Sequence, residues 1–147
     1  VLGHGDMDTF TQDYLGLWLV LFPFSYFGVH AIIALLLRIW GKGTSAPIRL
    51  RLYFAALLPG LLLGVLSTLM IPLVSMQTFE AMLVPSLALT ALAYGLTVFR
   101  GLGGAMEATA RAWRAALFGV IALAGDLLIM VATFIVDYAW LYERGPV

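Results

Sequence analysis

The chain has 147 residues, of which 63% are hydrophobic and only 11% are charged, and its formal net charge is zero. A composition this apolar, with a mean hydropathy of +1.01, is typical of an integral membrane protein and excludes an ordinary soluble domain. The balanced charge excludes a basic surface for nucleic acid, and the lack of cysteine excludes disulfides and a thiol nucleophile.

Four stretches are long and apolar enough to cross a membrane as helices, because about 20 apolar residues span the hydrocarbon core. In chain order we expect these spans at residues 14–40, 52–76, 81–100 and 112–140. No linker or repeat divides the sequence, so residues 1–147 are expected to form a single transmembrane domain. The sequence therefore predicts an all-α fold, a polytopic bundle of four helices.

The connection after the first span, RIWGKGTSAPIRLR, is rich in helix-breaking residues. Gly41 and Gly43 are expected to end the first helix, and Pro47 to prevent its continuation. With Lys42 between them, these glycines resemble the letters of a phosphate-binding loop, but the GxxxxGK spacing is missing. We therefore interpret the stretch as a helix stop.

The connection after the third span begins with Gly101, Gly103 and Gly104, which are expected to end that helix. The pattern AMEATARAWR then predicts the start of the fourth helix. Within it Glu107 and Arg111 are four residues apart, a spacing at which opposite charges stabilise an exposed helix.

The basic residues predict the orientation, since lysine and arginine collect in cytoplasmic connections. Seven of the eight basic residues flank the first and third connections: Arg38, Lys42, Arg49, Arg51, Arg100, Arg111 and Arg114. Both ends of the chain are therefore expected on the non-cytoplasmic side, in a membrane that we expect to be the bacterial inner membrane.

Asp126 lies in the middle of the fourth span, where a carboxylate costs roughly 2.5 to 3.5 kcal/mol on insertion scales. At 1.5 Å per residue it lies about 18 Å beyond Arg114, near the bilayer midplane. Thr90 and His30 fall within side-chain reach of that depth, and Ser67 lies on a small-residue face of the second span. We expect Asp126 to form a hydrogen bond with one of these three, in its protonated form where no cation is near.

Small residues predict where helices meet. One narrow stripe of the fourth span is small or polar: Ala115, Gly119, Ala122, Asp126, Thr133 and Asp137. Bulky residues of the same span, which are expected to face lipid, are Phe118, Ile121, Leu128 and Ile135. Close helix packing is expected at Gly60 and Gly64 of the GLLLG stretch, and at Gly119 and Ala122.

The leading functional hypothesis is a non-catalytic membrane protein, an accessory, assembly or scaffold subunit in contact with lipid and other integral membrane proteins. No nucleophile, base and orienting group combine into a catalytic set, and no metal or cofactor is expected. One alternative is a small transporter or proton-conducting subunit centred on Asp126, since intramembrane ionisable residues mark such paths. Another is a cofactor- or pigment-bearing subunit with His30 as the ligand.

Two longer segments are similar to parts of a known family. In GVHAIIALLLRIWGKGTSAPIRLRLYFAALLPGLLLG, a span ends in a Gly-Lys-Gly loop and a proline-containing span follows. In YGLTVFRGLGGAMEATARAWRAALFGVIAL, a short connection precedes the final span. Over about residues 28–132 the chain thereby resembles the YIP family of polytopic membrane proteins, named for Ypt/Rab-interacting proteins. The matching positions are Gly41, Lys42, Gly43 and Pro59.

The resemblance implies a membrane protein that is not an enzyme and that works by associating with other membrane proteins. In eukaryotes the family is linked to Rab GTPases and early secretory traffic. Members typically have five spans, so the resemblance also implies that a first span is missing before residue 1, which agrees with the expected outward termini.

Overall fold

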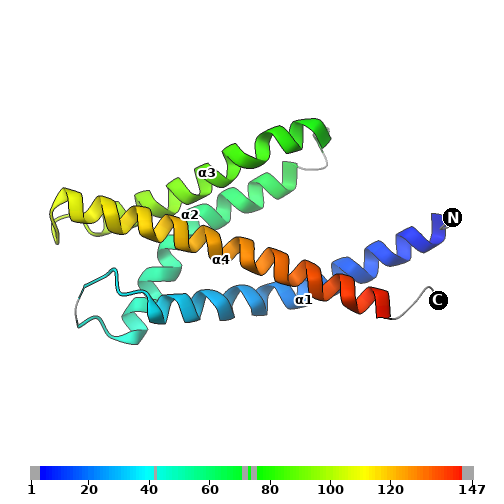
Figure 1. The fold of residues 1–147 in the computed structure, drawn as a ribbon, viewed down its shortest axis with the longest axis horizontal. Helices are drawn as coiled ribbons and strands as arrows, with labels where there is room; N and C mark the ends of the chain where they lie inside the picture. The colour runs from blue at the N-terminus through cyan, green and yellow to red at the C-terminus, as the bar shows by residue number, and fades with distance from the viewer. Residues whose placement is uncertain (1–3, 42, 71–72, 74–75, 144–147) are drawn as a thin grey trace. The chain divides into compact units, whose positions relative to one another are not determined.

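The computed structural model describes residues 4–41, 43–70, 73 and 76–143, and their side chains except at 4–15, 18, 67–70, 76, 79, 137, 138 and 140–143. Within these residues it contains four helices and no strand: α1 (His4–Leu36), α2 (Ala46–Met70), α3 (Met76–Gly101) and α4 (Ala108–Glu143) (Figure 1). Each contains a stretch of at least 18 residues that is apolar enough to cross a membrane. The predicted all-α fold with four membrane-spanning helices is confirmed, while the orientation stays a prediction.

Contacts within the chain gather into two compact units, which are described separately. The first unit comprises Val1–Ala31 with Gly125–Val147, and the second comprises Ile32–Ala124. In the first unit, the α1 and α4 portions run antiparallel (Figure 1). Among the described side chains of this unit, those that are buried are Tyr26, His30, Ile129 and Thr133. The two from each helix are one turn apart, so each pair lies on one helix face.

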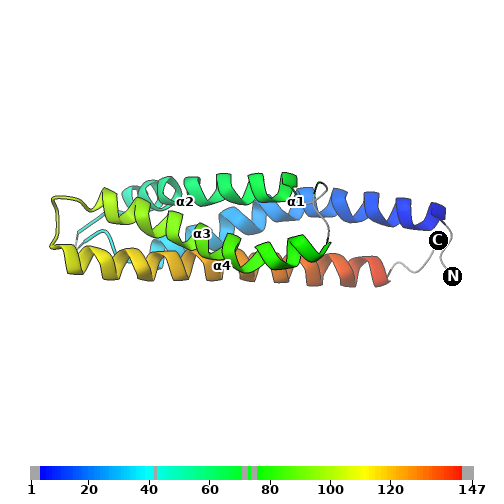
Figure 2. The same ribbon diagram turned by 90° about the horizontal axis from the view of Figure 1, so that it is seen from above.

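The second unit is built on the antiparallel helices α2 and α3, which lie side by side in Figures 1 and 2. Gly60 of α2 lies under the ring of Tyr94 on α3, where a Cβ atom would come within 2.1 Å of the ring. Gly119 of α4 lies against α3, where a Cβ atom would come within 2.6 Å of the Ala91 carbonyl oxygen. The lack of a side chain at these glycines therefore allows the helices to approach closely.

Phe118 of α4 lies at the centre of the second unit's core. Its side chain is fully buried, and the ring centroids of Tyr53, Trp40 and Tyr94 lie 5.1, 6.0 and 6.4 Å from its own. The prediction that Phe118 faces lipid is therefore wrong. The prediction assumed that α4 buries only its stripe of small residues. In the structure, this part of α4 is covered by α3, by α2 and by the loop after α1.

The start of α2 differs from the expected span. The backbone amide of Arg49 donates to the Ser45 carbonyl oxygen at 3.0 Å, so the helix begins at Ala46 rather than near residue 52. Pro47 lies in the first turn, where its missing N–H removes no helical hydrogen bond. Pro47 is therefore part of the start of α2, and not only a barrier to the first helix.

The end of α1 also comes earlier than expected. The helix ends at Leu36, before Gly41 and Gly43. These glycines have φ angles of 113° and 91°, which other residues adopt at a cost, so they shape the loop rather than the helix end.

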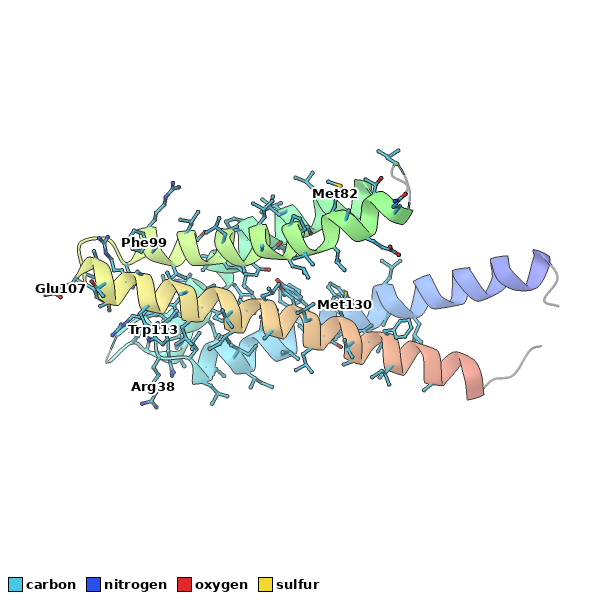
Figure 3. All side chains as sticks on the ribbon, turned by 45° about the horizontal axis from the view of Figure 1, so that its top comes forward. Arg38, Met82, Phe99, Glu107, Trp113 and Met130 are labelled. Atoms are coloured by element: carbon cyan, nitrogen blue, oxygen red, sulfur yellow. The ribbon has the colours of Figure 1, made fainter. Side chains whose placement is uncertain are left out.

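The third connection follows its glycines more closely. α3 ends at Gly101, Gly104 has a φ angle of 80°, and α4 begins at Ala108. The expected pairing in the first turn of α4 is wrong: although both residues are described, Arg111 forms no ion pair with Glu107. Its guanidinium lies 4.7 Å from the centre of the Phe99 ring, and Glu107 points away from the start of α4 (Figure 3). An ion pair with Glu107 would require two long, mobile side chains to be ordered. The face of the Phe99 ring attracts the guanidinium cation and requires only the arginine side chain to be ordered.

Candidate functional site

His30 of α1 and Asp126 of α4 form the polar centre of the first unit. The imidazole Nε2 lies 2.9 Å from Oδ1 of the carboxyl group. The side chain of His30 is completely buried, and that of Asp126 is 23% exposed. Of the three partners that the sequence left open for Asp126, His30 is the one that the structure places against it.

The chemistry of this pair explains how an acid is accommodated in an apolar span. The ring Nε2–H, in the protonated or the neutral imidazole, donates a hydrogen bond to the carboxylate, or the carboxylic acid donates one to an unprotonated Nε2. The pair carries no net charge when the protonated ring faces the carboxylate or the neutral ring faces the acid. Both of these forms avoid the cost of an isolated charge in hydrocarbon. The His30–Asp126 pair therefore joins α1 to α4 at a depth where neither residue would be favourable alone.

An aromatic ladder positions the imidazole. The Tyr26 ring centroid lies 4.5 Å from that of His30, and the Phe22 centroid lies 5.7 Å from that of Tyr26. Sequence reasoning missed this ladder. Its signal was the spacing of four residues between successive members, which places all three side chains on one face of α1.

The other two candidate partners of Asp126, Thr90 and Ser67, belong to the second unit. The Thr90 hydroxyl donates to the Ser86 carbonyl oxygen at 3.0 Å, one turn earlier in α3. The Ser67 side chain lies outside the described residues. Thr133, two turns after Asp126 on α4, is 3% exposed, and its hydroxyl has no hydrogen-bond partner among the described residues.

The predicted packing residues divide into two groups. Gly60 and Gly119 lie at tight helix contacts, and Ala122 is completely buried. Gly64 is exposed, and a Cβ atom there would meet nothing within 4 Å. Only part of the GLLLG stretch therefore faces a neighbouring helix of this chain.

The bulky residues of α4 beyond Phe118 also differ among themselves. Leu128 and Ile135 are exposed, as expected for a lipid-facing surface, whereas Ile121 is half-buried.

Of the residues predicted in the first connection, Gly41 and Gly43 line a cavity at the loop. Lys42 lies outside the described residues.

The arrangement limits what the pair can do chemically. His30 and Asp126 are the only acidic, basic or histidine residues between Leu19 and Leu36 and between Ala115 and Val136. A proton relay through these spans would therefore need titratable groups from other segments or other proteins. A pigment metal would need the Nδ1 atom of His30, because Nε2 is bonded to Asp126.

Neither a family model, nor a curated protein, nor a solved structure matches the chain. The resemblance to the YIP family therefore stays a prediction. What is established is an integral membrane protein with four apolar helices long enough to cross a membrane.

Proposed function

We propose that the protein is a non-catalytic accessory or scaffold subunit that associates with other integral membrane proteins. The observation that carries this proposal is the apolar surface left exposed on α3. Only 11% of its span, Glu80–Gly101, is buried. The large apolar side chains exposed along it are Met82, Leu83, Val84, Leu89, Leu92 and Leu96.

The form of this surface supports contact with another helix. The exposed residues begin at Met82, near one end of α3 (Figure 3), and continue to Leu96, so they extend along most of the span. A face of this length matches a transmembrane helix, which packs by van der Waals contact along its whole span. Lipid chains alone would cover the same face in an isolated subunit, which makes the two cases separable by experiment.

The polar chemistry of the spans supports a structural role. The His30–Asp126 hydrogen bond connects two residues of the same unit to each other, which is what a fastening contact between helices requires. The resemblance to the YIP family supports the same proposal, because its members work by association with other membrane proteins.

Site-specific photocrosslinking in native membranes tests the proposal. A benzophenone amino acid is placed at Leu89 or Leu92, which are each 56% exposed on α3, and adducts are identified by mass spectrometry. We expect a discrete protein adduct at one or both positions. The matched control is Val98 on the same helix, which is completely buried and should give only intramolecular products.

Two results would contradict the proposal. One is a set of adducts that contain only lipid at every exposed α3 position. The other is a monomer free of other proteins after extraction in a mild detergent, together with a proton flux in vesicles that requires Asp126. That second result would favour the proton-conducting alternative.

A further inference from the structure

A cavity rich in arginine lies where α1 ends and α2 and α4 begin, within the second unit. Its volume is about 480 Å³, and it is lined by Arg38, Gly41, Gly43, Thr44, Arg49 and Arg114. Arg38 and Trp113 both lie at this end of the unit (Figure 3). Three arginine residues from three separate segments therefore line one space.

Hydrogen bonds to the backbone hold two of these arginines in place. Arg114 donates from a terminal nitrogen to the Ile39 carbonyl oxygen at 2.7 Å, and Arg49 donates to the carbonyl oxygen of Leu35. A guanidinium has five N–H donors, so each keeps others for a ligand. The Nε atom of Arg49 is buried and has no hydrogen-bond partner among the described residues.

A hydrogen bond and two backbone angles define the described residues of the loop after α1. The Thr44 hydroxyl donates to the Gly41 carbonyl oxygen at 3.1 Å, and Gly41 and Gly43 adopt the left-handed backbone angles described above. Gly41, Gly43 and Thr44 therefore form one wall of the cavity.

The described residues of the second unit hold no acidic partner for the arginines of the cavity. None of the lining residues is acidic, and the described residues show no ion pair to any of the three arginines. The acidic residues of the second unit are Glu80 and Glu107. Glu80 is at the start of α3, about 30 Å along the helix from its arginine-bearing end at 1.5 Å per residue, and Glu107 points away from the start of α4 (Figure 3). An anion would therefore supply the partner that these three arginines lack among the described residues.

We propose that this cavity binds a phosphate group. The planar guanidinium fork matches two phosphate oxygens at once, and several arginines around one space are the typical protein site for this anion. The hydrogen bonds to backbone carbonyl oxygens use one donor each of Arg49 and Arg114. They leave the role of Arg38 and of the buried Nε atom of Arg49 unexplained.

The surroundings favour the phosphate of an anionic phospholipid. The apolar stretches of α1 and α2 end at this cavity, which places it at headgroup depth. The exposed Leu36, Ile48 and Trp113 lie within two positions of the lining arginines in sequence and offer apolar surface to acyl chains. A soluble phosphate compound presents the same chemical group, and the experiment separates the two sources.

Native mass spectrometry of the detergent-solubilised full chain tests the site. Phosphatidylglycerol, phosphatidic acid and diacylglycerol are titrated in turn, and the last of these lacks phosphate. We expect the two phospholipids to bind and diacylglycerol not to bind.

Arg38→Gln should weaken phospholipid binding about tenfold, the value of one charged hydrogen bond. Arg38 is exposed, so its loss leaves the core intact. The matched control is Arg51→Gln, which removes one exposed arginine of α2 outside the cavity and should leave binding unchanged.

The outcomes separate the site from general attraction between charges. Equal weakening by Arg51→Gln, or equal binding of diacylglycerol, overturns the proposal. Release of the lipid by millimolar inorganic phosphate supports a phosphate site filled from solution, and retention of the lipid supports a lipid source. Photoactivatable phosphatidylglycerol adds a test that needs no variant. Labelling of unchanged protein at residues 38–49 and 114 supports the site, and labelling confined to α3 overturns it.

Discussion

The imidazole of His30 and the carboxyl group of Asp126 are 96 positions apart in the chain and 2.9 Å apart in space. This contact gives a physical reason for an acid in the middle of α4. Substitution of either residue tests the contact, because it leaves the polar group of the other without this hydrogen bond.

Replacement of the pair by leucine should show that the two residues stabilise the fold jointly. We expect Asp126→Leu and His30→Leu each to lower the free energy of unfolding by about 1 to 3 kcal/mol, the cost of a buried polar group that has lost its partner. The double variant should lose less than the sum, with a coupling energy of about 0.6 to 1.7 kcal/mol. Unfolding in mixed detergent measures all three, and strictly additive losses would contradict a direct interaction.

Asp126→Asn tests whether the carboxyl group conducts protons. Asparagine keeps the shape and a hydrogen-bond acceptor but cannot take up a proton in exchange. If the pair is a fastening contact, the proton flux of vesicles containing this variant should equal that of vesicles containing the unchanged protein. A pH-sensitive dye inside the vesicles measures the flux, and protein-free vesicles give the baseline. A flux present in the unchanged protein and lost in the variant would contradict the structural role.

Gly60 and Gly64 form a matched pair for testing helix contact. Gly60→Ala should destabilise the protein by about 1 to 3 kcal/mol, because the new methyl group overlaps the buried Tyr94 ring. Gly64→Ala places its methyl group in open space and should change stability by less than about 0.5 kcal/mol. Thermal unfolding in one detergent compares them, and equal effects would show that the α2–α3 contact differs from the one described.

Phe118→Ala tests the aromatic core of the second unit. Removing a completely buried ring that contacts three others should cost about 3 to 5 kcal/mol. Phe24→Ala is the control, because Phe24 is 77% exposed and its loss should be nearly neutral to folding. Denaturation followed by tryptophan fluorescence reports both, and a small effect at Phe118 would restore the lipid-facing interpretation.

The number and type of the helices could be predicted because hydropathy alone decides them. A chain in lipid must satisfy its backbone hydrogen bonds internally, so every long apolar stretch becomes a helix. The boundaries were less predictable, since counting spans between charged residues excluded Arg49 and Arg51, which lie inside the first turns of α2.

The candidate site was only partly predictable. Depth along each helix reduced the partners of Asp126 to a few, but depth does not say which way a helix is rotated. Thr90 had a suitable depth, yet its hydroxyl is bonded within α3. For the same reason GLLLG could not reveal that Gly60 lies at a contact and Gly64 does not.

The arginine cavity had no local sequence pattern. Arg38 and Arg49 lie close in the chain, but Arg114 comes from the start of α4 and joins them only through the fold. The GKGTS stretch covers one loop only, whereas the arginines that line the cavity come from three segments of the chain.

The hydrogen bond from Arg114 to the Ile39 carbonyl oxygen joins residues 75 positions apart. During biosynthesis Ile39 leaves the ribosome well before Arg114, so the turn after α1 is made while the donor for that carbonyl oxygen is still absent. The turn can reach its final form only once α4 has been made. Nascent chains arrested ahead of Arg114 should therefore expose this turn to proteases that no longer cut it when synthesis has passed that point.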